Sequence, residues 1–300
     1  RFLVLHRRRL FNPSEKVWMG WERKRGKLHE LNQLLRGATH TSFVGSNGEP
    51  PWVPDDVRYV ITLDADTRLP REAALRLIGK MAHPLNCPQL DLKTQRVIAG
   101  YGILQPRVTP SLSIGTEGSF YQQVFSAPGG IDPYTAAASD VYQDLFGEGS
   151  FTGKGIYDVD AFVAALENRV ADNTMLSHDL FEGIFARAGL VSDVEVVEEF
   201  PARYDVVAKR QDRWTRGDWQ LLPWIFKKRT DNAGASALGR WKILDNLRRS
   251  LVAPTTLLAL MLSWLLPPAL AWLATSFVLA TIAIPAFMPC LFSIMPHRTG

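Results

Sequence analysis

The stretch YVITLDADTRLP, residues Tyr59 to Pro70, decides the fold of this chain. Its apolar, β-branched start belongs to a run from Val57 to Leu63 that predicts a strand buried on both faces. The run ends on two carboxylates, Asp64 and Asp66. Because open α/β sheets bind ligands at the carboxyl ends of their strands, the sequence predicts a binding site here.

Segments on either side alternate between helical and strand patterns. Before the central stretch, leucine spacing predicts a helix from Gly26 to Gly37; after it, a helix opens at Pro70 with four residues facing inward, namely Ala74, Leu75, Ile78 and Met81. A strand is expected from Arg96 to Leu104, stopping before Pro106. Further along we expect helices at about Val159 to Val170 and Asp179 to Ala188, and a strand at Val191 to Val197. This order predicts a mixed or parallel α/β sheet.

Asp64 and Asp66 have three possible roles. Two carboxylates in a turn that leaves a strand can hold a divalent cation, which then neutralises a diphosphate. Alternatively, they only cap the helix that follows Pro70. A third possibility is an Asp-x-Asp-x-Thr phosphohydrolase, with Thr67 completing the motif and Asp64 as nucleophile. That reaction needs a later lysine and a second acidic pair in a recognisable order, which the sequence does not supply convincingly.

Two further groups carry chemistry. Asp179 precedes a helical pattern and is either its N-cap or a general base that takes a proton from an acceptor hydroxyl. Arg210, Arg213 and Trp214 are spaced to share one helical face. Arginine forks bind phosphate oxygens and an indole supports a sugar ring, but the same residues also suit anchoring at a membrane surface.

Glycine-rich segments give weaker signals. Gly26 and Lys27 at a helix start could hold a phosphate through backbone N–H groups and an ammonium. The glycines around Lys154 predict either a backbone that approaches a ligand or a flexible turn. The small residues from Ser126 to Asp140 predict a long mobile loop.

The last part of the chain has a different character. From Ser250 to Pro296 there is no Asp, Glu, Lys or Arg, and a run of this length can cross a bilayer core of about 30 Å twice. Pro267-Pro268 is then a turn between two spans or a kink within one. Before this run stand basic residues and a tryptophan-rich segment typical of an interfacial helix: Arg240, Lys242, Arg248, Arg249, Trp214, Trp219 and Trp224. The positive charge on this side predicts that the globular part faces the cytoplasm.

Composition excludes several classes of protein. A net charge of +4 in 300 residues is too small to indicate nucleic-acid binding, and two cysteines supply neither a disulfide framework nor a metal cluster. A non-catalytic membrane module is disfavoured because the uncharged tail carries no path of ionisable groups. Because the chain starts with Arg1 and no signal peptide precedes the folded part, we expect it to be part of a longer polypeptide.

In combination these motifs resemble the processive, membrane-bound glycosyltransferases of the cellulose and hyaluronan synthase type. Longer strings resemble the glycosyltransferase domain of cyclic β-1,2-glucan synthases: WERKRGKLHELNQLLRG from Trp21, YVITLDADTRLP from Tyr59, FGEGSFTGKGIYDVDAF from Phe146, MLSHDLFEG from Met175 and RQDRWTRGDWQLLPW from Arg210. The resemblance implies an α/β GT-A-like domain over residues 1–205, interfacial helices over 206–249 and transmembrane helices over 250–296. The globular domain would lack its first strand, together with the donor-binding Asp that the family carries there.

The resemblance also implies the roles of the site residues. Asp64 and Asp66 would bind Mg²⁺ or Mn²⁺ and UDP-glucose, with Asp66 as the more direct metal ligand. Lys27 would contact the donor, while a second set would close over the diphosphate and the acceptor sugar, namely Arg210, Arg213 and Trp214. Asp179 would be the general base of an inverting transfer of glucose to a β-1,2-glucan chain.

Three expectations about the context of the domain follow from the same resemblance. Synthesis would be primed on a protein tyrosine, for which Tyr134 in the loop from Gly129 to Asp140 is the candidate. The enzyme would be a multi-pass protein of the bacterial inner membrane, in contact with lipid and with its catalytic domain in the cytoplasm. A phosphorylase-type domain would lie elsewhere in the full-length chain.

Overall fold

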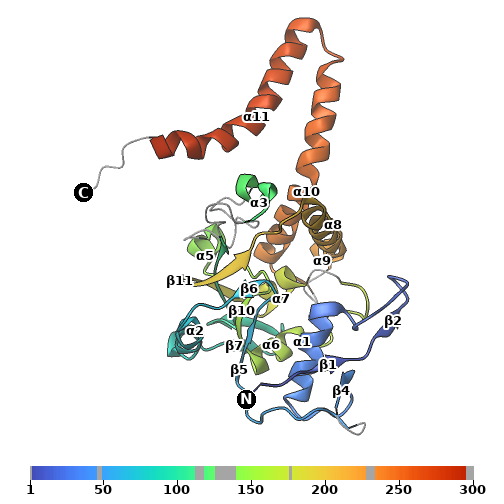
Figure 1. Cartoon of the computed structure of the whole chain (residues 1–300), viewed down its shortest axis with the longest axis vertical. Helices are drawn as coiled ribbons and strands as arrows, with labels where there is room; N and C mark the ends of the chain where they lie inside the picture. Colours follow the sequence, from blue (N-terminus) through green and yellow to red (C-terminus); the bar gives the residue numbers. More distant parts are fainter. Residues whose placement is uncertain are drawn as a thin grey trace, which may run out of the picture. The chain divides into compact units, whose positions relative to one another are not determined.

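The computed structural model describes residues 2–45, 49–111, 118–125, 140–175, 178–227 and 234–294 (Figure 1). The chain divides into two compact units, residues 1–244 and residues 245–300. Tyr134 lies outside the described residues, as does nearly all of the predicted loop around it.

The first unit is built on a mixed sheet of five strands in the order β5-β10-β9-β11-β6 (Figure 1). These strands are β5 (Tyr59–Thr62), β6 (Thr67–Arg68), β9 (Ile103–Ser111), β10 (Gly155–Asp158) and β11 (Ala188–Glu199). β9 and β11 are parallel, and the other neighbouring pairs are antiparallel. The sequence prediction of a mixed α/β sheet is therefore confirmed.

Short strand pairs surround this sheet. β1 (His6–Arg7) pairs with β4 (Phe43–Val44), β2 (Leu10–Asn12) with β3 (Val17–Met19), and β7 (Gln89–Asp91) with β8 (Arg96–Ala99). The helices of the first unit are α1 (Arg23–Leu34), α2 (Ala73–Met81), α3 (Phe120–Phe125), α5 (Val141–Phe146), α6 (Val159–Leu166), α7 (Asp179–Phe185), α8 (Tyr204–Gln220) and α9 (Leu222–Phe226).

Helices cover both faces of the central sheet, as the two middle residues of β10 show. Ile156 packs in the cluster that α2 contributes to, whereas Tyr157 stacks on Phe162 of α6 and donates a hydrogen bond of 2.7 Å to Asn32 of α1. Because neighbouring residues of a strand point to opposite faces, α2 lies on one face and α1 with α6 on the other.

Three sequence-based expectations about these elements were wrong in detail. β5 is the edge strand of the sheet, so Tyr59, Val60 and Ile61 are only partly buried. The strand expected to stop before Pro106 is instead two strands, β8 and β9, which are separated around Gly100 in the left-handed conformation at φ +62°. β9 then continues through Pro106, which lies where the pairing with β11 shifts register, so the missing N–H is tolerated.

The third difference is the inward face of α2. The helix starts at Ala73 and buries Ala73, Leu77 and Met81, while Leu75 is 72% exposed. Met81 is buried as predicted, but Ala73 and Leu77 take the places expected for Ala74 and Ile78, so the buried stripe follows an i, i+4, i+8 spacing.

The second unit contains most of α10 (Ala237–Ser263) and all of α11 (Pro268–Ile294), so the two prolines predicted as a turn or a kink lie at a turn between helices. Among the described residues, one helix is long and apolar enough to span a bilayer, namely α11 over Pro268–Pro285. The first half of α10 contains charged residues, so α10 is not among the helices apolar enough to span a bilayer. A single candidate span is thus present, and the second one stays a prediction.

Candidate active site

Asp64 and Asp66 lie at the end of β5, in a turn in which the carbonyl of Asp64 accepts from the N–H of Thr67. Two ammonium groups engage Asp64: Lys24 Nζ at 2.6 Å from Oδ1 and Lys154 Nζ at 3.2 Å from Oδ2. Burial alone would raise the pKa of Asp64, but Lys24 and Lys154 together outweigh it and lower the pKa. The Asp64 carboxylate is therefore held ionised, with a cation on each oxygen.

β11 brings a third carboxylate to the same place. Glu198 pairs in register with Thr67, and the N–H of Glu199 donates to the carbonyl of Asp66. Lys154 Nζ lies 3.2 Å from Glu198 as well as from Asp64. Burial alone would lower the pKa of Lys154, but Glu198 and Asp64 raise it above the usual lysine value. Lys154 is thus a buried ammonium shared by two carboxylates.

Arg210 of α8 completes a series of ion pairs whose two ends, Asp64 and Asp66, are joined only by the backbone. One guanidinium nitrogen lies 2.9 Å from Asp66 Oδ2, and the other lies 3.2 Å from Glu198. The series runs from Asp64 through Lys154, Glu198 and Arg210 to Asp66, and we call it the charge ring. It joins the end of β5, the start of β10, the end of β11 and the middle of α8.

The other two residues of the predicted phosphate and sugar face lie beside this ring. The ring of Trp214 lies 5.9 Å from the Arg210 guanidinium, centroid to carbon. The pKa of Arg213 is lowered by partial burial and by the positive charges of Arg23 and Arg210, against which Asp64 acts. The structure thus brings Arg210, Arg213 and Trp214 together with Asp64 and Asp66, as the sequence predicted.

Asp179 lies next to the charge ring, with its carboxylate against the backbone of Gly153. Lys24 Nζ, which holds Asp64, also donates to the carbonyl of Gly153 at 2.6 Å. Gly153 has φ +83°, and a Cβ there would lie 2.7 Å from Asp179 Oδ1. The glycine is required because its backbone passes directly over the Asp179 carboxylate.

The alternative role of Asp179 as a helix cap is wrong. The N-cap of α7 is His178, whose side chain makes no capping hydrogen bond. Asp179 Oδ1 is buried without a hydrogen-bond partner in the described part of the chain. A carboxylate with a buried, unsatisfied oxygen beside the charge ring suits proton transfer better than capping.

Gly26 and Lys27 are not at the start of a helix. α1 begins at Arg23, so the N–H of Gly26 already donates to the carbonyl of Glu22, and Lys27 is exposed. Lys24, one turn earlier, is the lysine that reaches Asp64. The role of Lys27 as a donor contact stays a prediction.

Sequence reasoning missed Lys24, Lys154 and Glu198. Lys24 stands in a run of basic residues in which no position is distinguished, and Glu198 is one of three acidic residues near the end of β11. Lys154 alone carried a usable signal, because a charged residue between two glycines is rarely placed in a strand entry without a partner.

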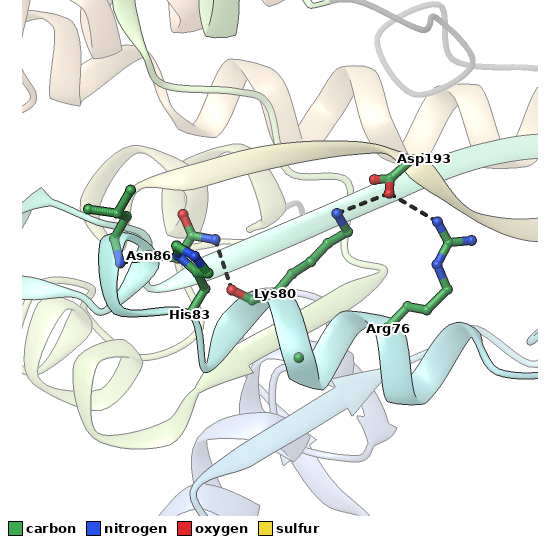
Figure 2. Close-up of a pocket in the computed structure, with 7 residues that line it drawn as sticks. Arg76, Lys80, His83, Asn86 and Asp193 are labelled. Carbon is green, nitrogen blue, oxygen red and sulfur yellow. Dashed lines mark hydrogen bonds and ion pairs between the residues drawn. The ribbon is translucent and has the colours of Figure 1, made fainter.

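A hollow lies at the end of α2 and is lined by none of the residues described above (Figure 2). Its two cations, Arg76 and Lys80, both lie 3.0 Å from Asp193 of β11. Because Asp193 already neutralises them and no residue of the charge ring lines this hollow, it is not part of the candidate active site.

Asp64 and Asp66 offer the kind of oxygen ligand that a divalent cation takes, with unequal availability. Oxygen ligands are what Mg²⁺ and Mn²⁺ prefer, and such sites commonly use one or two carboxylates plus substrate phosphates. Both oxygens of Asp64 are engaged by ammonium groups, whereas Asp66 has an ion pair on Oδ2 alone. Asp66 is therefore the better direct ligand.

Comparison with known proteins identifies the relationship. No protein-family model matches the chain. The chain is 55% identical, over 99% of its length, to the cyclic beta-(1,2)-glucan synthase NdvB of Rhizobium meliloti (strain 1021). This chain is homologous to a segment of a cyclic β-1,2-glucan synthase. It spans 10% of the length of NdvB, so it corresponds to one part of that protein. The relationship inferred from the motifs is confirmed.

Proposed function

We propose that this chain is the catalytic glycosyltransferase part of an enzyme that builds β-1,2-glucan from UDP-glucose by an inverting transfer. The observation that carries the proposal is the charge ring, which gathers Asp64, Asp66 and Arg210 at one edge of the sheet with Asp179 beside it. A nucleotide-sugar donor needs this combination of oxygen ligands, phosphate-binding cations and a nearby base.

At the donor end, Asp66 would hold Mg²⁺ or Mn²⁺, with Asp64 contacting the nucleotide. The cation would neutralise charge on the leaving diphosphate. Arg210 and Arg213 would bind diphosphate oxygens, which frees the carboxylates that Arg210 pairs with, Asp66 and Glu198, for the cation. Trp214 would support the acceptor sugar, and Lys27 would add a further donor contact.

At the acceptor end, Asp179 would accept the proton of the acceptor 2-hydroxyl. The acceptor oxygen then forms a bond to C1 of glucose while the bond from C1 to the diphosphate oxygen breaks. The proton stays on Asp179 and the electron pair leaves with UDP. Attack from the face opposite the leaving group inverts the anomeric carbon, so an α-linked donor gives a β linkage.

The setting of this reaction is also part of the proposal. The apolar helix α11 supports membrane association, and a second span in the uncharged run would make the protein multi-pass in a bacterial inner membrane, with the active site in the cytoplasm. The phosphorylase-type domain expected for this family would belong to another part of the full-length protein.

Glucan synthesis would be primed on Tyr134. Its replacement by Phe in the full-length protein should abolish protein-linked glucan formed from UDP-glucose. Protein-linked glucan at the level of the parent protein in Tyr134→Phe would place the primer elsewhere, and would leave the transferase assignment intact.

The proposal is tested by incubating membranes that contain the full-length protein with radiolabelled UDP-glucose, with Mg²⁺ or Mn²⁺ and with EDTA. We expect labelled β-1,2-glucan that depends on the cation. A phosphohydrolase would instead release phosphate and become covalently phosphorylated on Asp64. A non-catalytic membrane module would form neither glucan nor a phosphorylated Asp64. Either of those outcomes contradicts the proposal.

A further inference from the structure

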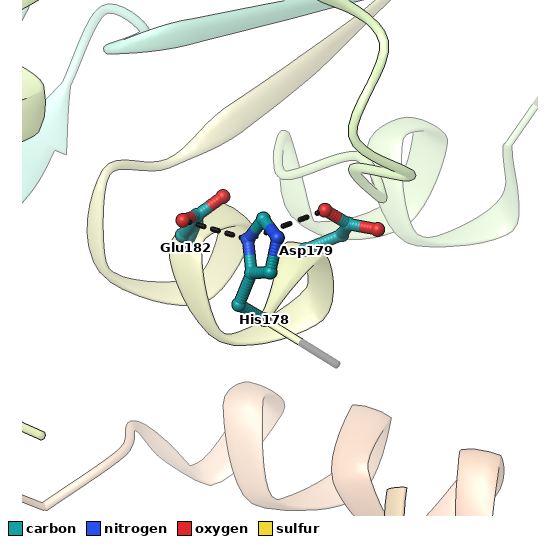
Figure 3. Close-up of side chains that lie close together, drawn as sticks. All are labelled: His178, Asp179 and Glu182. Atoms are coloured by element: carbon teal, nitrogen blue, oxygen red, sulfur yellow. Dashed lines mark ion pairs between the residues drawn. The ribbon is translucent and has the colours of Figure 1, made fainter. Parts of the chain in front are cut away.

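The Asp179 carboxylate belongs to a cluster of three titratable side chains, two of which are buried (Figure 3). His178, Asp179 and Glu182 each place a polar atom within 4.8 Å of the others. His178 is 5% exposed and Glu182 2% exposed, whereas the Asp179 side chain keeps 31% of its surface exposed. Two members are therefore in the interior, and the third connects the interior to the site.

His178 forms a close ion pair with Glu182, although its Nδ1 makes no hydrogen bond within the described part of the chain. Nδ1 of the imidazole lies 2.8 Å from Glu182 Oε1, one helical turn later. The same Nδ1 lies 3.4 Å from Asp179 Oδ1 (Figure 3). Burial alone would lower the pKa of His178, but the carboxylates of Glu182 and Asp179 outweigh it and raise the pKa. The imidazolium form is thus favoured between the two carboxylates.

The two oxygens of Asp179 differ in their surroundings. Oδ1 is buried, faces the imidazolium and has no hydrogen bond in the described part of the chain. The side chain as a whole is 31% exposed, and Oδ2 would lie 2.9 Å from a Cβ placed on Gly153. A base needs one oxygen held by the protein and the other free to take the proton.

We propose that His178, paired with Glu182, is a positioning residue that fixes the buried Oδ1 of Asp179 and leaves Oδ2 to accept the proton of the acceptor hydroxyl. The inference rests on the function proposed above, since it assigns a support to the base of that reaction.

Other charged and titratable groups face this cluster from neighbouring elements. Lys24 and Arg25 approach from α1, and Tyr157 approaches from β10. Glu182 is itself titratable, and burial raises its pKa above the usual value although His178 acts against this. Removing the imidazole removes the neighbour that contacts both carboxylates of the cluster.

The test uses the full-length protein in membranes and compares His178→Asn, His178→Ala and Glu182→Gln. Asn keeps a donor near the position of Nδ1 but carries no charge, while Ala keeps neither. For His178→Ala we expect kcat to fall about 10- to 100-fold, with KM for UDP-glucose within twofold. His178→Asn should recover most of this loss at pH 8. The acid-side midpoint of its rate profile should nevertheless rise by about one pH unit, because the cation is lost.

Glu182→Gln should move the acid-side midpoint in the same direction, because His178 then loses the partner that keeps it protonated. The matched control is His83→Asn, an exposed histidine outside the site, which should leave the profile unchanged. If His178→Asn and His178→Ala lose activity equally at every pH, with the acid-side midpoint unmoved, His178 is merely structural and the inference is wrong.

The proposed function fails separately. If Asp179→Asn transfers glucose as fast as the parent protein, the base assignment is wrong, and the inference about its support is overturned with it. Activity lost in Asp179→Asn but unaltered in all three support variants overturns the inference alone.

Discussion

At the scale of single residues, Lys154 links the two halves of the site. Its ammonium is shared by Asp64 and Glu198, and Glu198 shares Arg210 with Asp66. Without Lys154, two carboxylates that approach one cation would face each other directly. Repulsion would then move Asp64 or Glu198 away from the geometry that a donor diphosphate requires.

Replacing Lys154 by Met should therefore reduce transfer by at least about tenfold and raise KM for UDP-glucose, since a misplaced donor site weakens both binding and alignment. Initial rates at varied UDP-glucose concentrations measure both. Lys80→Met is the matched control, because Lys80 pairs with Asp193 at the end of α2. Equal kinetics in the two variants would contradict the role given to Lys154.

Gly153 offers a second test with a well-matched control. Its backbone has φ +83°, and a Cβ would lie 2.7 Å from Asp179 Oδ1. Gly37 has φ +86° with nothing within 4 Å of a Cβ. Both alanine variants should lose about 1–2 kcal/mol of stability from backbone strain, visible in thermal unfolding. Gly153→Ala alone should also lose transfer, by about 100-fold or more. Similar transfer rates in the two variants would show that Asp179 does not depend on this contact.

At the scale of elements, α9 and α7 are joined by an aromatic contact. Trp224 of α9 is buried, and its ring lies 5.2 Å from Phe181, centroid to centroid. The sequence placed Trp224 on a membrane-facing stripe with Trp219, but the two differ: Trp219 is 42% exposed. Periodicity cannot distinguish a helix face that meets lipid from one that meets a neighbouring helix, because both are apolar.

Trp224→Ala should consequently destabilise the first unit by about 3–5 kcal/mol, the usual cost of removing a large buried aromatic side chain. Trp219→Ala should cost much less. Heat inactivation of the two variants in parallel measures the difference. A larger loss for Trp219→Ala would indicate that the stripe, and not the contact with Phe181, stabilises these helices.

The local pattern predicted most of the helices and the longer strands, because strand ends and helix faces are encoded locally, whereas the resemblance implied that Asp64, Asp66, Asp179 and Arg210 share one site. β10 was missed, since its glycine-rich entry indicated a turn or a backbone near a ligand. The boundaries of the helices and strands were harder to predict from the sequence. The start of α1, the inward face of α2 and the course of β9 through Pro106 depend on contacts between distant segments. Lys24 and Glu198 were missed for the same reason, since only the folded sheet brings them to Asp64.

At the scale of the whole molecule, α11 is the helix of the described residues that is long and apolar enough to cross a membrane. It is apolar over Pro268–Pro285, and large side chains such as Phe277 are exposed on it. An arginine at the centre of a span costs about 2.5–3.5 kcal/mol in translocon insertion. Phe277→Arg should thus lower the insertion equilibrium of α11, placed in a reporter membrane protein, by more than tenfold. Leu273→Ala serves as the control, and equal insertion of these two variants of α11 would contradict a spanning role.

The central claim is that different residues carry out donor binding and proton acceptance. Asp66→Asn and Asp179→Asn in the full-length protein test it together, with UDP-glucose binding and glucosyl transfer measured on the same membranes. Asp66→Asn should weaken both, whereas Asp179→Asn should bind UDP-glucose nearly as the parent protein does and lose transfer by about 100-fold or more. If Asp179→Asn lost binding and transfer equally, or lost neither, Asp179 would not be the base, and the central claim would be wrong.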